Sequence, residues 1–177
     1  MLILASKSPR RKELLSIITK DFVIKSADVD ETIPGGYSPR EAVEYLSKIK
    51  AEPFASEDDT VIGADTVVAI GDRILGKPID REDAFNMLKA LSGKHHSVFT
   101  GVTVIKNGKT ATFSAETRVK FFDLNDKQIK DYIACGECDD KAGAYGIQGR
   151  GALLVEGIDG DYFNVVGLPI GLLNSYL

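Results

Sequence analysis

The segment from Thr60 to Ile70 constrains the fold more than any other, because it is almost entirely apolar. A run of this kind is typical of a strand that is buried on both faces of a sheet. Asp65 lies in its middle, and a buried carboxylate is costly unless it is paired or bound to a metal. We therefore expect Asp65 to have a strong partner and a functional role. The alternative is an aspartate that accepts backbone hydrogen bonds at a bulge near Gly63.

The first residues have the pattern of an anion site. Leu2 to Ala5 reads as a short strand that leads into a helix, with Ser8 as the N-cap and Pro9 at the first helical position. Unpaired N–H groups at a helix start attract anions, and Arg10 and Arg11 add guanidinium groups that chelate phosphate. We expect a polyphosphate site here; the alternative is a solvated basic turn.

Capping residues, turns and apolar periodicity predict the remaining elements. Helices are expected after Ser38-Pro39, after Asp80 and over 124–135, and strands over 22–24, 74–75, 96–105, 111–122 and 152–156, with hairpin turns at Gly71-Asp72, Asn107-Gly108 and Asp159-Gly160 and a short closing helix. This order predicts a mixed α/β (α+β) fold, in which helices flank a long twisted sheet of parallel and antiparallel strands.

Composition limits the class of protein. The 177 residues, of which 44% are hydrophobic, suit a single domain over residues 1–177. The net charge of -4 argues against a general binder of nucleic acid or acidic membranes. We find no apolar run long enough to span a bilayer and no signal-peptide pattern, so a cytoplasmic location is expected.

Several familiar sites are not supported. Cys135 and Cys138 have C-x-x-C spacing, but a structural zinc ion needs four ligands. His95 and His96 are adjacent, so a strand would point one toward the core and the other toward solvent. We therefore interpret the cysteines as incidental. The sequence has no P-loop and no G-x-G-x-x-G motif after the first strand.

A glycine-rich segment over 139–151 contains Asp140, Lys141, Tyr145 and Gln148. Small residues let a backbone approach a ligand closely, and the polar residues between them could recognise it. The alternative is a flexible loop.

Taken together, the motifs resemble those of the Maf family, also called septum formation inhibitor Maf-like proteins. The resemblance spans nearly the whole chain, in the segments 5–11, 28–31, 63–68, 76–78, 91–93, 140–149 and 166–169. It implies a metal-dependent nucleoside triphosphate pyrophosphatase, with Mg²⁺ or Mn²⁺, that releases a monophosphate and pyrophosphate. It also implies two lobes around a central cleft and a homodimer.

The resemblance assigns roles to individual residues. Asp65 matches the catalytic proton acceptor, and Arg11, Thr66 and Gln148 match positions linked to base preference in the branch that acts on dTTP and UTP. CTP and modified pyrimidine nucleotides are further candidates. Together with the chemistry of phosphate transfer, it makes Glu31 and Asp65 the metal candidates. The expected triphosphate ligands are Ser6, Arg10, Arg11, Lys50 and Lys77.

Two other functions stay open at this point. A regulator of cell division could bind the triphosphate without hydrolysing it, but it would not need an isolated carboxylate opposite a cationic cluster. A single-strand nucleic-acid module would need aromatic residues within a basic stripe, whereas this chain has no tryptophan and is acidic.

Overall fold

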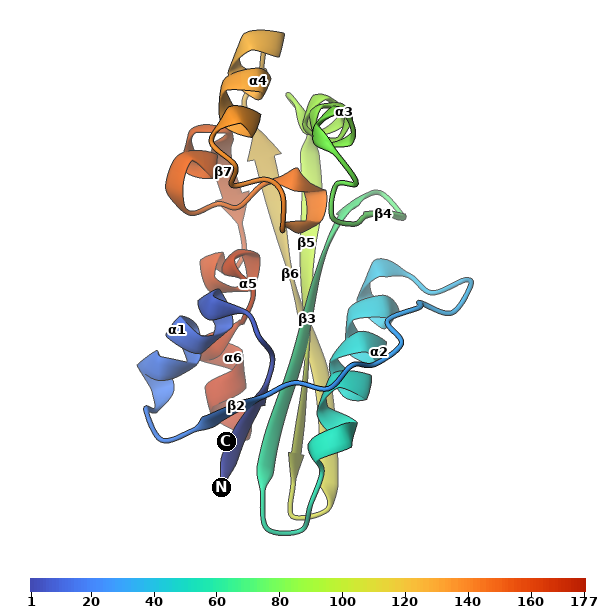
Figure 1. Cartoon of the computed structure of the whole chain (residues 1–177), viewed down its shortest axis with the longest axis vertical. Coiled ribbons are helices and arrows are strands. Elements are labelled where there is room, and N and C mark those ends of the chain that lie inside the picture. The colour runs from blue at the N-terminus through green and yellow to red at the C-terminus, as the bar shows by residue number, and fades with distance from the viewer. The chain divides into compact units, whose positions relative to one another are not determined.

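The computed structural model describes all 177 residues and has a mixed α/β fold (Figure 1). Its seven-stranded sheet has the order β2-β1-β3-β5-β6-β7, and β4 pairs with β3. The strands are β1 (Leu2–Ala5), β2 (Val23–Lys25), β3 (Thr60–Ile70), β4 (Arg73–Leu75), β5 (His95–Lys106), β6 (Lys109–Phe121) and β7 (Val155–Asp159). β1 is parallel to β2 and β3, whereas β4 and β7 are antiparallel to their neighbours. The predicted class and the mixed sheet are confirmed.

The chain forms six α-helices, of which the first three begin where the capping residues predicted. They are α1 (Pro9–Ile18), α2 (Pro39–Ala51), α3 (Arg81–Leu91), α4 (Asp126–Ala134), α5 (Tyr162–Val166) and α6 (Ile170–Leu173). Ser8, Ser38 and Asp80 cap the first three, and Ser38 forms the predicted capping box with Glu41. None of the helices combines the length and the hydropathy that a membrane-spanning helix requires.

Two predictions near the C-terminus are wrong. The expected strand over 152–156 begins only at Val155, because residues 149–153 form a 3₁₀ helix. The Glu137 carboxylate accepts hydrogen bonds from the backbone N–H groups of Arg150 and Gly151, which holds that turn. The turn at Asp159-Gly160 does not form a hairpin either, because the chain continues into α5, which buries Asn164 and Val166.

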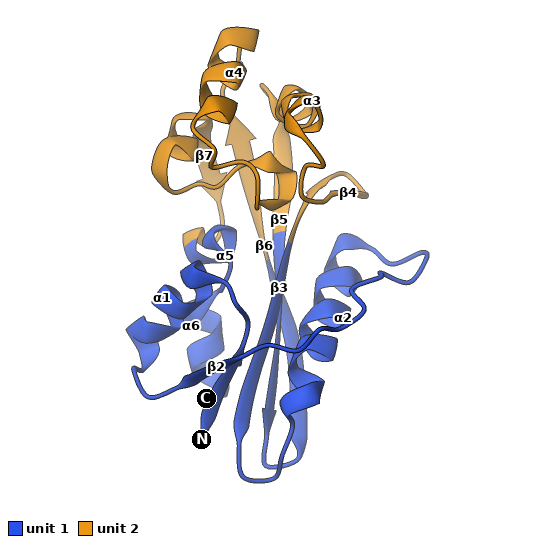
Figure 2. Ribbon diagram, viewed as in Figure 1, with its two compact units in different colours: residues 1–66, 99–115, 163–177 blue, residues 67–98, 116–162 orange.

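The chain divides into two compact units (Figure 2). The first contains residues 1–66, 99–115 and 163–177, and the second contains residues 67–98 and 116–162. β3, β5 and β6 each supply residues to both units. The expectations of a single domain and of a central cleft remain predictions.

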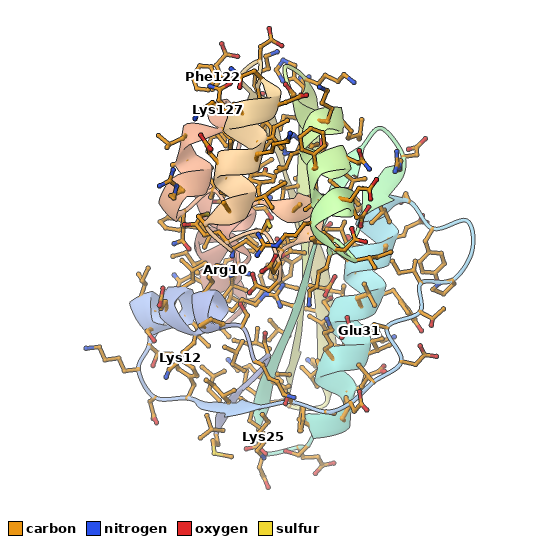
Figure 3. All side chains as sticks on the ribbon, turned by 45° about the horizontal axis from the view of Figure 1, so that its top comes forward. Arg10, Lys12, Lys25, Glu31, Phe122 and Lys127 are labelled. Carbon is orange, nitrogen blue, oxygen red and sulfur yellow. The ribbon has the colours of Figure 1, made fainter.

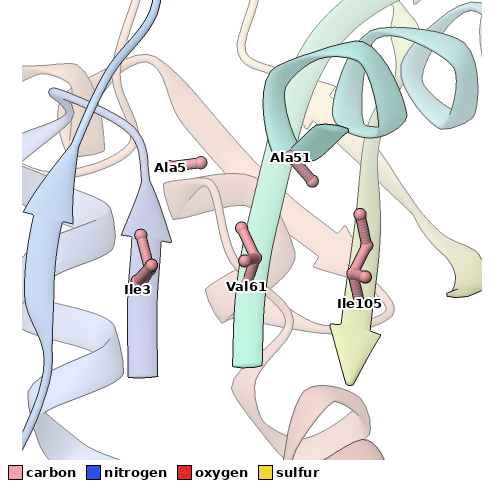
Figure 4. Packing of buried hydrophobic residues seen from close by; sticks show 5 residues of the cluster. All are labelled: Ile3, Ala5, Ala51, Val61 and Ile105. Carbon is pink, nitrogen blue, oxygen red and sulfur yellow. The ribbon is translucent and has the colours of Figure 1, made fainter. Parts of the chain in front are cut away.

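In the first unit, α2 packs closely on the sheet. Ala51 at the end of α2 joins a buried cluster with Ile3, Ala5, Val61 and Ile105 from β1, β3 and β5 (Figure 4). The contact is tight because β3 carries a glycine: a methyl group at Gly63 would lie 2.2 Å from the carbonyl oxygen of Ser47 in α2. This close approach fixes α2, and with it Lys50, against the strand that carries Asp65.

In the second unit, aromatic residues hold the glycine-rich segment. His96 is only 3% exposed, and its Nε2 lies 2.7 Å from the Tyr145 hydroxyl. Phe121 packs edge-on against both rings. His95 is exposed, which confirms the prediction of one core-facing and one exposed histidine.

Candidate functional site

Asp65 has the strong partner that its burial requires. The residue is 9% exposed, and its Oδ1 lies 2.5 Å from the ammonium nitrogen of Lys50 in α2. The same ammonium lies 2.9 Å from Oε2 of Glu31, which is in the segment before α2. Two carboxylates from distant parts of the sequence therefore converge on one cation. The paired interpretation of Asp65 is confirmed, and the partner is a side chain instead of the backbone of a bulge.

Arg11 connects four parts of the first unit. Its Nε donates to the carbonyl oxygen of Gly167 at 2.9 Å, its Nη2 to Oγ1 of Thr66 at 3.1 Å, and its Nη1 to Oγ of Ser6 at 3.3 Å. Burial lowers the pKa of the Arg11 guanidinium, and the negative charge of Asp65 raises it. Arginine stays protonated despite such a shift, so Arg11 keeps a positive charge among these residues.

The start of α1 brings further donors to the same place. Ser6 is buried, and its hydroxyl accepts hydrogen bonds from the backbone N–H of Ser8 and from Arg11. Arg10 is half-buried, and its charge also lowers the pKa of Arg11. Figure 3 shows Arg10 at the start of α1 and Glu31 beside α2. The structure thus places cations and a helix N-terminus near a pair of carboxylates.

Thr66, which follows Asp65 in β3, is tied to a residue that the sequence analysis missed. Its hydroxyl lies 2.8 Å from the hydroxyl of Thr100 in β5, and Thr100 donates to the carbonyl oxygen of Asn164 at 2.9 Å. Thr100 is fully buried. Nothing in the sequence distinguishes it from Thr103 in the same strand, so only the structure could identify it.

Two of the predicted site residues, Lys77 and Gln148, belong to the second unit and are exposed. Within that unit the segments that carry them are joined, since the N–H of Gly143 donates to the carbonyl oxygen of Gly76 at 3.0 Å. The other predicted residues lie in the first unit: Ser6, Arg10, Arg11, Glu31, Lys50, Asp65 and Thr66.

The glycine-rich segment is held at several points and is not a free loop. Besides the bond between Tyr145 and His96, the Tyr132 hydroxyl accepts from the N–H of Gly146 at 3.2 Å. Burial raises the pKa of Tyr132 above its usual range, so its hydroxyl stays protonated. These contacts fix the backbone before Ile147 and Gln148, and the hydrogen bonds from Arg150 and Gly151 to Glu137 fix it after them.

A metal ion in this protein would have few side-chain ligands. No group of three or more His, Cys, Asp or Glu residues comes together in a way that could hold one. Mg²⁺, however, is commonly bound through one or two carboxylates together with substrate phosphates and water. Oε2 of Glu31 and Oδ1 of Asp65 already lie around one cation, the Lys50 ammonium. These two carboxylates therefore fit the small number of protein ligands that Mg²⁺ needs.

The chain is similar to curated proteins over almost its whole length. It is 52% identical over 171 residues to a protein of Geobacillus sp. (strain WCH70) named dTTP/UTP pyrophosphatase, with 96% of this chain and 92% of the relative covered. It is 50% identical over 174 residues to a protein of the same name from Thermococcus gammatolerans, with 98% and 93% covered.

A solved structure supports the fold. The Staphylococcus aureus Ham1 protein matches with a TM-score of 0.56 and 14% sequence identity, covering 99% of this chain and 96% of that chain. At this identity the likeness concerns the fold alone. A family model described as Maf-like protein matches residues 1–177, and with the close relatives it shows that the chain belongs to the Maf family.

Proposed function

We propose that this protein hydrolyses dTTP and UTP to the nucleoside monophosphate and pyrophosphate, with a divalent metal such as Mg²⁺ or Mn²⁺. CTP and modified pyrimidine triphosphates are further candidate substrates. The observation that carries the proposal is the Asp65–Lys50–Glu31 cluster in the same compact unit as the Arg11 network and the start of α1. The names of the close relatives supply the substrates.

Charge and hydrogen bonding support triphosphate binding by Ser6, Arg10, Arg11, Lys50 and Lys77. Ser6 already accepts two hydrogen bonds, so its own proton is available for a phosphate oxygen. Arg11 uses three of its five N–H groups within the protein, which leaves two for a ligand. Cations of this kind stabilise the negative charge that develops on the phosphate oxygens in the transition state.

Asp65 is the proposed catalytic base. Oδ1 of Asp65 is bonded to Lys50, which leaves Oδ2 to accept a proton from the attacking water. The water oxygen then bonds to the α phosphorus, and the bond from that phosphorus to the bridging oxygen breaks. Pyrophosphate leaves with that electron pair.

Glu31 and Asp65 would hold the metal ion, together with phosphate oxygens of the substrate. When bound, the ion would supply Lewis-acid neutralisation of phosphate charge. Arg11, Thr66 and Gln148 are the proposed contacts for the base, on the resemblance to the dTTP/UTP branch. A homodimer and a cytoplasmic location complete the proposal, and sedimentation of the purified protein would test the dimer.

The experiment that tests the reaction compares dTTP, UTP, CTP, ATP and GTP, each with Mg²⁺, with Mn²⁺ and with EDTA. We expect pyrophosphate and monophosphate from dTTP and UTP, and loss of activity with EDTA. Orthophosphate as the first product would contradict the proposed bond cleavage. Binding of UTP without any hydrolysis would instead favour the regulator of cell division.

A further inference from the structure

The hydroxyl groups of Thr66 and Thr100 have a fixed hydrogen-bond direction. Thr100 donates its only proton to the carbonyl oxygen of Asn164, which can only accept. Its bond of 2.8 Å with Thr66 must therefore use the Thr66 proton. The two hydrogen bonds therefore run in one direction: Thr66 donates to Thr100, and Thr100 donates to the backbone carbonyl of Asn164.

This direction determines what Thr66 can offer a ligand. Its proton is directed to Thr100, and its oxygen accepts one hydrogen bond from Nη2 of Arg11 at 3.1 Å. The remaining hydrogen-bonding capacity of the half-buried Thr66 hydroxyl is a lone pair. The neighbouring Nη2 of Arg11 keeps one proton that no protein group uses. A ligand there meets an acceptor beside a donor.

We propose that Thr100 is a positioning residue that keeps Thr66 an acceptor, and that the site thereby selects a base presenting an N–H group beside a carbonyl oxygen. Thymine and uracil present this pair at N3 and its adjacent carbonyls. Cytosine in the same position presents an N3 lone pair, with O2 on one side and the N4 amino group on the other, so its N3 lone pair would face the lone pair of Thr66. The inference rests on the proposed function, because it takes the base to be bound at Arg11 and Thr66.

Thr100 acts through Thr66, since it is fully buried. Replacing Thr100 by valine keeps the shape but removes the acceptor, so the Thr66 hydroxyl becomes free to rotate and to donate to N3 of cytosine. Replacing Thr100 by serine keeps the hydroxyl and both of its hydrogen bonds.

Thr103 provides a matched control. It lies in the same strand, is also fully buried, and bonds to the hydroxyls of Ser47 at 2.8 Å and Thr112 at 3.0 Å. Thr103→Val therefore removes a buried hydroxyl from a comparable series of hydrogen bonds, and it leaves the contacts of Arg11 and Thr66 unchanged.

The test measures dissociation constants of UTP and CTP in EDTA, so that binding is separated from hydrolysis. We expect the wild type, Thr100→Ser and Thr103→Val to prefer UTP. In Thr100→Val the dissociation constant of CTP divided by that of UTP should fall about five- to tenfold, which is the value of one neutral hydrogen bond. Tighter CTP binding should contribute to this change. An unchanged ratio in Thr100→Val would overturn the inference.

A second measurement needs no variant and stays valid if Thr100→Val does not fold. N3-methyl-UTP lacks the N–H group, so the wild type should bind it at least about tenfold more weakly than UTP. Equal binding would overturn the inference. A wild type that binds UTP selectively but releases no pyrophosphate would contradict the proposed function and leave the inference standing.

Discussion

The ammonium of Lys50 forms ion pairs with two carboxylates, one of which is buried. Removing one partner of a buried ion pair leaves an uncompensated charge. We expect Lys50→Met to lower the free energy of unfolding by about 3 kcal/mol, and to cost much less when it is combined with Asp65→Asn. Urea unfolding of the single and double variants measures this coupling.

Lys48 in the same helix is the control for Lys50. It forms an exposed pair with Glu52 at 3.8 Å, so Lys48→Met should change the stability by less than about 0.5 kcal/mol. If Lys50→Met costs the same in the wild type as in the Asp65→Asn variant, the assigned pairing is contradicted.

His96 gives the stability a pH dependence. Burial, with a smaller effect from His95, lowers the pKa of His96 to about 4 from a usual value near 6.5. The unfolded chain therefore binds a proton at a higher pH than the folded protein does. We expect His96 to reduce the stability progressively as the pH falls from about 6.5 to about 4, by roughly 3 kcal/mol in total.

The same urea titration at several pH values tests this effect. His96→Gln removes the titrating group and should flatten the plot of unfolding free energy against pH between about 6.5 and about 4. His95→Gln should leave that plot sloping. An unchanged slope in His96→Gln would show that other groups cause it.

At the scale of elements, the glycines of the sheet set how close α2 can lie. Gly63 has no room for a methyl group against Ser47, and a methyl group at Gly101 in β5 would lie 2.2 Å from the carbonyl oxygen of Val43. We expect Gly63→Ala to cost about 1–3 kcal/mol of stability, as overpacked sites do, and to lower activity by displacing Lys50.

Gly157 in β7 is the matched site for that substitution, because nothing lies within 4 Å of a methyl group placed there. Gly157→Ala should leave both the stability and the activity close to those of the wild type. A Gly63→Ala variant with unchanged stability would show that α2 does not depend on this contact.

Elements with local signals could be predicted from the sequence. The caps at Ser8, Ser38 and Asp80, and the turn at Asn107-Gly108 with positive φ angles of 52° and 69°, are set by neighbouring residues. The strand expected from Ala152 was wrong because Glu137, a distant residue, holds the backbone of Arg150 and Gly151 in a turn.

At the scale of the whole molecule, long-range contacts decide what local patterns leave open. The sequence indicated that Asp65 needs a partner, but the choice of Lys50 depends on how α2 lies on β3. The part played by Thr100 depends on the pairing of strands that are far apart in the sequence. The strand order and the sharing of β3, β5 and β6 between two compact units follow from such contacts.

The central claim is that a nucleotide-binding network and a catalytic carboxylate form one hydrolytic site. It is tested most directly with Asp65→Asn, by measuring pyrophosphate release from UTP and the dissociation constant of UTP in EDTA on the same preparation. We predict a fall in kcat of about 10²- to 10⁴-fold, the usual contribution of a general base, while UTP is still bound. Undiminished pyrophosphate release by a folded Asp65→Asn variant would contradict the account.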